Sequence, residues 1–155
     1  MTPAVNQLKK AGIAFTLHHY EHSPQSTSYG EEAAARLGVS EDRIFKTLMV
    51  SLDKRSPAVS IVPVSGKLNL KACAAAMGAK KVAMADPKEA ERVTGYVRGG
   101  ISPLGQKKQL KTVIDSSALE CETIYVSAGK RGLQIELAAR DLAGLTGAVF
   151  ASITT

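Results

Sequence analysis

Residues 94–105 form the segment whose residue types best suit the binding of a ligand. A single serine there stands among glycines and a proline, in the order Gly99, Gly100, Ile101, Ser102, Pro103, Leu104, Gly105. Glycine lets a ligand approach the main chain closely. Successive N–H groups in such a loop can hold a phosphate or a carbonyl oxygen. The segment predicts a binding loop or, as the alternative, an ordinary tight turn. It lacks the G-x-S-x-G spacing of a nucleophile elbow.

Lys46 is the second residue whose position suggests chemistry. It stands near the start of residues 44–52, an otherwise uncharged segment that we predict to be a strand. Alternation places Leu48 and Val50 on the same face of that strand. A lysine at the edge of a buried face can hold its ammonium over a pocket. The alternative is a lysine whose stem covers the strand end while its ammonium stays in water.

All three histidines of the chain lie within residues 18–22, which raises the question of a metal site. On a strand, His18 and His22 share one face and His19 lies on the other. The segment also lacks the H-E-x-x-H arrangement of zinc hydrolases. We therefore expect no metal, and assign these side chains to the surface or to a polar pocket wall.

No Ser-His-Asp or Cys-His set is evident from residue spacing. Cys73 falls on the apolar stripe of a predicted helix, which favours a small core residue. Cys121 has no partner at C-x-x-C spacing. If the chain is a hydrolase, its nucleophile need not come from the protein. We expect no cofactor.

Composition favours one compact domain covering residues 1–155. The formal net charge of +6 suits a polyanionic partner such as RNA, although it also fits simple solubility. Two cysteines without metal spacing, and no signal-peptide or membrane-length apolar run, favour the cytoplasm and exclude a membrane protein.

Periodicity and capping signals predict alternating helices and strands. We expect helices at residues 3–11, 29–37 (with a Ser28–Glu31 capping box), 70–77, 87–94 and around 142–145. We expect strands at residues 13–20, 44–52, 58–64, 81–84, 123–127, 133–137 and 149–153. Several strands that neighbour in sequence are expected to pair antiparallel, with helices in the gaps. The expected fold is mixed α/β (α+β): a curled mixed sheet, or partial barrel, flanked by helices. The chain contains neither a P-loop nor a G-x-G-x-x-G after the first strand, so we do not expect a doubly wound nucleotide-binding fold.

Collinear motifs along nearly the whole chain resemble the YbaK family of bacterial Cys-tRNA(Pro) deacylases, relatives of the editing domain inserted in many prolyl-tRNA synthetases. The motifs include Thr2-Pro3-Ala4-Val5, His19-Tyr20-Glu21-His22, Tyr29-Gly30, Phe45-Lys46-Thr47-Leu48, Pro63-Val64-Ser65-Gly66, Met84-Ala85-Asp86-Pro87, Thr94-Gly95-Tyr96, Ile124-Tyr125-Val126-Ser127-Ala128-Gly129 and Arg131-Gly132-Leu133. The most specific is Gly99-Gly100-Ile101-Ser102-Pro103-Leu104-Gly105-Gln106-Lys107-Lys108.

The resemblance implies a compact mixed α/β fold in which Lys46 is the essential pocket lysine. It implies that Gly99 and Gly100 shape the wall around the terminal adenosine and the aminoacyl group. Tyr20 and Tyr29 would line the same pocket. Ile101, Ser102 and Pro103 of the loop motif are expected to bind substrate as well.

The resemblance also implies a substrate-assisted reaction, in which the cysteinyl thiol attacks its own ester and leaves as a thiolactone. The expected partners are aminoacylated tRNA and, transiently, prolyl-tRNA synthetase, with trans-editing as the function. Two positions depart from the family pattern: Gln134 stands where some relatives carry an acid, and Arg98 where an apolar residue is common.

Two other functions remain open: hydrolysis of Ala-tRNA(Pro), and a non-catalytic RNA- or nucleotide-binding module. The Tyr29-Gly30 and Gly-Ile-Ser-Pro-Leu-Gly stretches favour the cysteine branch. The sequence does not determine the tRNA contacts, the oligomeric state, or the balance between Cys-tRNA(Pro) and Cys-tRNA(Cys).

Overall fold

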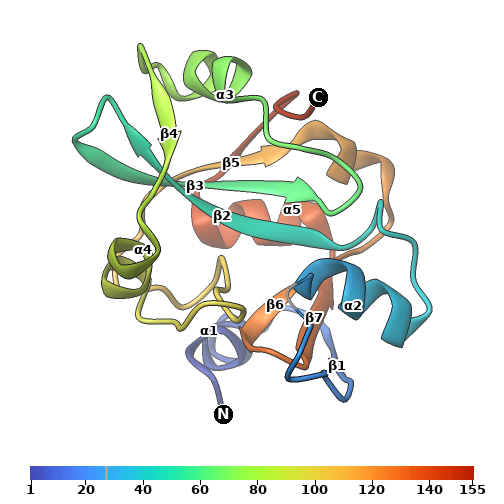
Figure 1. The fold of residues 1–155 in the computed structure, drawn as a ribbon. Helices are drawn as coiled ribbons and strands as arrows, with labels where there is room; N and C mark the ends of the chain where they lie inside the picture. The colour runs from blue at the N-terminus through green and yellow to red at the C-terminus, as the bar shows by residue number, and fades with distance from the viewer. Residues whose placement is uncertain (27) are drawn as a thin grey trace.

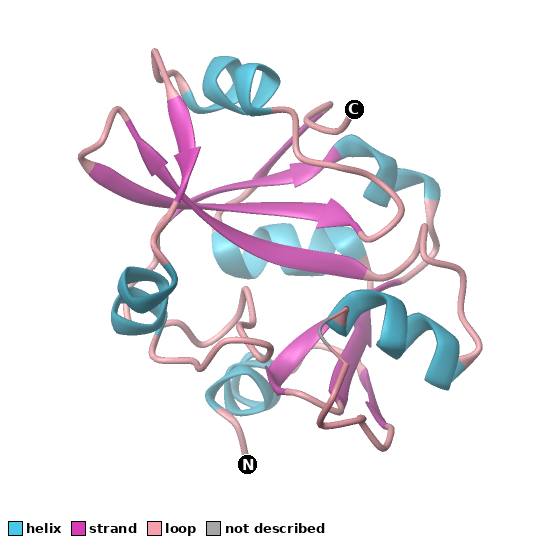
Figure 2. Ribbon diagram, in the orientation of Figure 1, coloured by secondary structure: helices cyan, strands magenta, loops and turns pink. Residues whose placement is uncertain are grey.

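Two β-sheets that join at one corner form the centre of the fold, and helices pack around them (Figure 1; Figure 2). The computed structural model describes residues 1–26 and 28–155. The elements follow the order α1 (Pro3–Ala11), β1 (Thr16–His19), α2 (Tyr29–Leu37), β2 (Phe45–Leu52), β3 (Ser56–Pro63), α3 (Leu70–Met77), β4 (Val82–Met84), α4 (Pro87–Thr94), β5 (Lys111–Asp115), a 3-10 helix (Ser116–Glu120), β6 (Ile124–Lys130), β7 (Leu133–Leu137), α5 (Ala139–Thr146) and β8 (Val149–Ala151).

The larger sheet has the strand order β4-β2-β3-β5-β8. β2 and β3 form an antiparallel hairpin over their full length, and β5 and β8 extend the sheet in parallel. β4 pairs with β2 from Val50 to Leu52. Within the described ranges, the first half of β2 therefore has a neighbouring strand on the β3 side alone.

The smaller sheet has the order β1-β7-β6, with both pairs antiparallel. A parallel bridge between Ile44 and Tyr125 connects it to the larger sheet. At this bridge the Tyr125 N–H donates to the Arg43 carbonyl oxygen over 2.9 Å. The two sheets curl toward each other at this corner without closing into a barrel.

Apolar side chains cover both faces of the larger sheet. On one face, Phe45 and Met49 pack with Leu142 of α5 and with α1 in the main core. On the opposite face, Val50 packs with Cys73 of α3 in a second core. A third cluster holds α2 against Ile44, Val64 and Tyr125 at the corner between the sheets. The corner is thus fixed by packing from both sheets and from α2.

The helix ends follow the capping signals in most cases. The Thr2 hydroxyl accepts from the Val5 N–H at the start of α1, and Gly12 ends that helix in the left-handed conformation. At α2 the bounds are as predicted, but the capping box is wrong, since the Ser28 side chain makes no cap hydrogen bond. The Glu32 carboxylate instead accepts from the Ser23 N–H over 2.8 Å, so a residue inside α2 anchors the preceding segment.

The mixed α/β class is confirmed, and so are most of the predicted elements. The structure divides the strands between two sheets, and β5 is a strand for which the sequence pattern gave no signal. β5 lacks the alternation of apolar and polar residues typical of a half-buried strand, because both of its faces are buried, at Thr112, Val113, Ile114 and Asp115. No helix within residues 1–26 and 28–155 is long and apolar enough to cross a bilayer.

The loop that follows α4 is anchored on α1 through Gly105. Its N–H donates to the Gln7 side-chain oxygen over 2.7 Å. Its φ is +66°, and a Cβ there would lie 2.5 Å from the Pro3 carbonyl carbon. Only glycine fits this backbone conformation and this close approach.

We predict that Gly105→Ala lowers the free energy of unfolding by about 3 kcal/mol or more, because a left-handed alanine would also collide with main-chain atoms. Gly12→Ala is the matched control: its φ is +69°, but nothing lies within 4 Å of the added Cβ. That control should cost about 1 kcal/mol. Denaturant unfolding of both variants measures the difference, and equal losses would contradict the packing argument.

Candidate functional site

A pocket of about 410 Å³ lies where the two sheets, the start of α2 and the loop after α4 meet. Figure 1 shows the elements that contribute to it: β2, the start of α2, and the yellow loop that follows α4. The pocket is lined by Tyr20, Ser28, Tyr29, Gly30, Glu31, Ile44, Phe45, Lys46, Thr47, Leu48, Val64, Arg98, Gly99, Ile101, Ser127 and Gln134. It therefore brings together Lys46, Tyr20, Tyr29, Gly99 and Ile101 of the predicted site.

The open edge of β2 forms one wall of this pocket. Beyond it, the Ala85 N–H donates to the Met49 carbonyl oxygen over 3.0 Å, which shows that Met49 points its main-chain groups away from β3. Main-chain groups alternate between the two edges of a strand. Those of Phe45 and Thr47 therefore point to the same edge. Phe45 lies at the bridge to Tyr125, whereas Thr47 lies between that bridge and the β4 pairing, where its main-chain groups can bind a ligand.

Lys46 lies on the face of β2 between the cluster under α2 and the core under α3. The side chain is half-buried. Among the described residues its ammonium makes no ion pair or hydrogen bond. A cation without a carboxylate partner at a pocket wall can bind a carbonyl oxygen, an oxyanion or a phosphate.

The floor of the pocket comes from the smaller sheet. Ser127 of β6 and Gln134 of β7 are cross-strand partners, and Tyr20 follows β1 on the same face. Burial raises the pKa of the Tyr20 hydroxyl above its ordinary value, so this group remains a hydrogen-bond donor at neutral pH. The floor is polar and carries no carboxylate among its described residues.

Arg131 holds the start of α2 over the pocket. Its guanidinium lies 4.6 Å from the centroid of the Tyr29 ring and donates to the Glu32 carboxylate over 3.0 Å. It also donates to the carbonyl oxygens of Ser23 and Ser26. Burial opposes ionisation of Glu32, but the Ser23 N–H and Arg131 outweigh it and hold the pKa of that carboxyl below its ordinary value. The charge of Arg131 is thus engaged within the protein, unlike that of Lys46.

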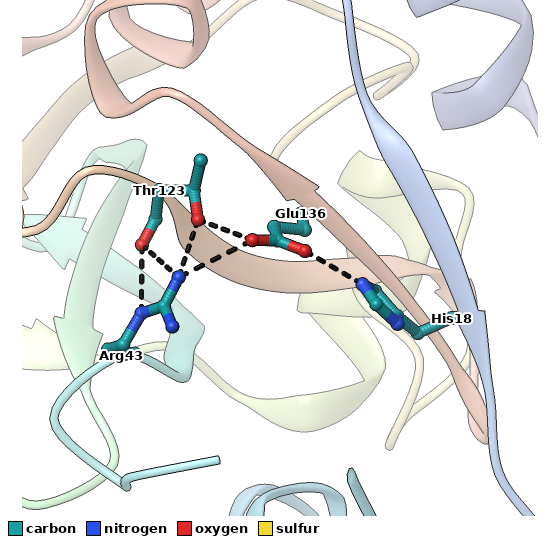
Figure 3. Close-up of polar contacts among 4 residues, drawn as sticks. All are labelled: His18, Arg43, Thr123 and Glu136. Carbon is teal, nitrogen blue, oxygen red and sulfur yellow. Dashed lines mark hydrogen bonds and ion pairs between the residues drawn. The ribbon is translucent and has the colours of Figure 1, made fainter.

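A second ionic network joins the two sheets behind the pocket (Figure 3). Glu136 of β7 accepts from the Thr123 hydroxyl over 2.5 Å and contacts His18 of β1 over 2.9 Å. Arg43, just before β2, donates to the Thr123 carbonyl oxygen and to Glu136. The Thr123 hydroxyl, more than His18, holds the pKa of Glu136 below its ordinary value, while partial burial opposes it. This network fixes the direction in which β2 leaves the corner.

The glycine loop meets the pocket through some of its residues. Gly99, with a φ of +88°, lies so close to the Tyr29 ring that a Cβ would be 3.4 Å from it. Gly100 instead packs on the β6–β7 turn, where a Cβ would lie 3.0 Å from the Lys130 Cα. Ser102 and Pro103 are buried outside the pocket lining. The Ser102 hydroxyl accepts from the Leu104 N–H, which is a structural role within the loop.

The histidines and cysteines lie away from the pocket lining. His18 contacts Glu136, and residues 1–26 and 28–155 contain no group of three or more metal-ligating side chains. Cys73 is fully buried in the core, 3.1 Å from the Ser60 hydroxyl. Burial raises the pKa of the Cys121 thiol, which makes that side chain a weaker nucleophile at neutral pH.

Sequence reasoning did not identify Thr47, Ser127 or the main-chain edge of β2 as pocket groups. Ser127 lies inside a motif that resembles the family pattern, so the sequence carries a signal for it. The sequence marks Gln134 only as a departure from that pattern. Its burial and the lack of a partner for its side-chain oxygen are tertiary facts that no spacing rule reveals.

Comparison with known proteins identifies relatives over most or all of the chain. Residues 22–145 match the aminoacyl-tRNA editing domain family. EbsC of Enterococcus faecalis, a proposed Cys-tRNA(Pro)/Cys-tRNA(Cys) deacylase, is 42% identical over 154 residues, covering 99% of this chain and 93% of EbsC.

Solved structures with the same fold include the hypothetical protein APE2540. It is 29% identical, with a TM-score of 0.87 and 99% of each chain covered. Another is a proposed trans-editing enzyme for prolyl-tRNA synthetase, 23% identical, with a TM-score of 0.85, 100% of this chain and 99% of that chain covered. At that identity, the second likeness bears on the fold alone.

We predict that Glu136→Gln destabilises the protein by about 1–2 kcal/mol at pH 7, since three partners lose a charged acceptor. Because the folded-state pKa of Glu136 is lowered, its stabilising effect is present above the unfolded-state pKa and is lost as pH falls through the folded-state value. The difference between wild type and variant should therefore shrink below about pH 4. Chemical unfolding across pH 3–7 measures it.

Glu122→Gln is the control for this experiment. Glu122 is exposed and makes no hydrogen bond or ion pair with the described residues. Its stability should match wild type at every pH. A Glu136→Gln difference that stays constant down to pH 3 would mean that the carboxylate charge is not the stabilising feature.

Proposed function

Because this chain belongs to the aminoacyl-tRNA editing domain family, we propose that its pocket removes cysteine from Cys-tRNA(Pro). Aminoacyl-tRNA deacylation is the activity of the chain, and the identity of the amino acid is the proposed part. The observation that carries it is the 42% identity, over nearly the full chain, to a proposed Cys-tRNA(Pro)/Cys-tRNA(Cys) deacylase.

The pocket chemistry supports a reaction in which the protein orients the ester and stabilises charge. The Lys46 ammonium has no carboxylate partner among the described residues and would neutralise the oxyanion that forms on the ester carbonyl. The Thr47 N–H at the open β2 edge is a second donor facing the same space. The Tyr29 ring would cover the aminoacyl group.

The described lining of the pocket contains no cysteine and no histidine. Its aliphatic hydroxyls, on Ser28, Thr47 and Ser127, make no hydrogen bond to a histidine or a carboxylate among the described residues, so none is paired with a base that would activate it as a nucleophile. This supports a nucleophile supplied by the substrate. We propose that the cysteinyl sulfur attacks its own carbonyl carbon and forms the C–S bond of a thiolactone. The C–O bond to the ribose then breaks, and the thiol proton is transferred to the departing tRNA 3′ oxygen. Water later opens the thiolactone to cysteine.

The proposed substrate also fits the surface around the pocket. An open hollow of about 810 Å³ borders the pocket at Tyr20 and is lined by Lys130, His19 and His22. We propose that the single-stranded 3′ end of the tRNA crosses this hollow, because a cation and aromatic rings suit a phosphate chain with unstacked bases. Prolyl-tRNA synthetase is the proposed transient partner, since it is the enzyme whose mischarging makes Cys-tRNA(Pro).

Hydrolysis of Ala-tRNA(Pro) is the competing function. Alanine lacks a thiol, so its removal would need an activated water, for which the described pocket lining offers the exposed Glu31 as its one carboxylate. A non-catalytic RNA-binding module is the third candidate. Deacylation assays with Cys-, Ala- and Pro-tRNA(Pro) distinguish the three, with cleavage of the first substrate alone expected.

We predict that Lys46→Ala lowers kcat/KM for Cys-tRNA(Pro) by about 10²–10³-fold while the fold survives, because one charge-stabilising donor is lost. Lys88→Ala is the control, since Lys88 is an exposed lysine of α4. Deacylation under single-turnover conditions, with unfolding curves for each variant, provides the measurement. A folded Lys46→Ala protein with normal turnover would end the assignment of Lys46.

We further predict that Ser-tRNA(Pro) is deacylated several orders of magnitude more slowly than Cys-tRNA(Pro), although both bind comparably. A thiol is partly ionised near neutral pH and intrinsically nucleophilic, whereas a hydroxyl is neither. A steric pocket alone would separate such similar side chains by about 10–200-fold. Single-turnover rates with enzyme in excess test this, together with trapping of the thiolactone. Comparable rates would indicate attack by water.

A further inference from the structure

Two residues of the pocket lining, Thr47 and Gln134, have a buried side-chain oxygen without a hydrogen-bond partner among the described residues, and Gln134 is the more deeply buried of the two. The residue is 8% exposed, and its side-chain oxygen Oε1 has no hydrogen-bond partner among the described residues. Buried amide oxygens are almost always paired, so an exception needs a reason. The lining of the pocket includes this residue, which places the exception at the candidate site.

The neighbouring donors on the same sheet face make no hydrogen bond to Oε1. His18, directly across from Gln134 on β1, directs its Nε2 to Glu136. Ser127, directly across on β6, accepts from the Gly129 N–H through its hydroxyl oxygen, and its own O–H makes no hydrogen bond to Oε1. A donor on a molecule that enters the pocket would complete the hydrogen bonding of Oε1.

The pocket thus presents two complementary groups. The Lys46 ammonium can bind an electron-rich oxygen, whereas Gln134 Oε1 is an acceptor and requires an N–H or O–H donor. An α-aminoacyl ester carries one partner for each on adjacent carbon atoms, its carbonyl oxygen and its α-ammonium. An ammonium also forms the stronger, charge-assisted hydrogen bond.

We propose that Gln134 Oε1 accepts a hydrogen bond from the α-ammonium of the aminoacyl group, and so orients the ester carbonyl toward Lys46. The inference rests on the proposed function and adds a residue that recognises the α-amino group. Gln134 carries no charge, so it binds the ammonium without competing, as a carboxylate would, for the Lys46 ammonium.

The test combines Gln134→Met with a substrate that lacks the α-ammonium. Methionine has a similar length but no comparable acceptor. 3-Mercaptopropanoyl-tRNA(Pro) keeps the thiol and the ester but has no amino group. Single-turnover kcat/KM values for both proteins on both substrates form a double-mutant cycle, in which the intrinsic reactivity of each substrate cancels.

We expect Gln134→Met to lower kcat/KM for Cys-tRNA(Pro) by about 10–100-fold, the usual effect of losing a hydrogen bond to a charged group. The same variant should change the value for 3-mercaptopropanoyl-tRNA(Pro) less than about threefold. Equal losses on the two substrates would overturn the assignment. A third arm repeats the cycle with Cys-tRNA(Pro) that ends in 2′-deoxyadenosine in place of the substrate without an amino group. If the effect of Gln134→Met disappears on this substrate and persists on 3-mercaptopropanoyl-tRNA(Pro), Gln134 binds the ribose 2′-hydroxyl, and the proposal is overturned.

Stability supplies the second readout. Since Oε1 has no partner to lose, Gln134→Met should leave the melting temperature unchanged or raise it. The control is Thr94→Val, at a buried hydroxyl that donates to the Ala90 carbonyl oxygen and accepts from the Tyr96 N–H. That variant should lower Tm by about 2–4 °C or more. A similar fall for Gln134→Met would indicate a structural role and contradict the proposal.

The outcomes distinguish a failure of the proposed deacylation from a failure of the role assigned to Gln134. A wild-type protein that leaves Cys-tRNA(Pro) intact would overturn the proposed function and this inference with it. An active wild-type protein whose cycle shows no coupling would overturn the inference alone.

Discussion

The corner at which the two sheets join is the constraint on which the site depends. One parallel bridge, Ile44 to Tyr125, makes the connection within the described residues, and β4 reaches β2 only from Val50 onward. The main-chain edge of β2 from Phe45 to Leu48 is therefore left beside the smaller sheet with space between them. This separation of the two sheets creates the pocket, whose walls come from β2 of the larger sheet and from the smaller sheet.

Ion pairs fix the elements around that corner relative to one another. Glu136 links β7 to β1 and to Arg43 in the segment before β2, while Arg131 ties the β6–β7 turn to the start of α2. Each of these charges is matched inside the protein. Lys46 differs, because its ammonium makes no ion pair or hydrogen bond with the described residues. This contrast between paired and unpaired charge distinguishes the groups that build the pocket from the group that we propose acts in it.

Much of the fold could be predicted from local signals, since helix caps and strand alternation act over a few residues. Pro3 and Gly12 bound α1 as expected, and Phe45 to Leu52 forms the strand that carries Lys46. β5 could not be predicted, because residues buried on both faces lack alternation. The Ser28 capping box failed for a different reason: Arg131, distant in sequence, engages Glu32 and the preceding segment.

For the site, the sequence by itself determined which residue types were available: a lone lysine on an uncharged strand, a glycine-rich loop, and motifs that indicate the editing family. Tertiary structure decided which of them meet. It placed Lys46, Tyr29 and Gly99 around one pocket, and turned Ser102 into the loop interior and Gly100 onto the β6–β7 turn. It also brought Gln134 to the floor with an unmatched oxygen. The physical reason is that hydrogen-bond satisfaction and burial depend on contacts between β2, β7 and α2, which are far apart in the chain and adjacent only in the folded protein.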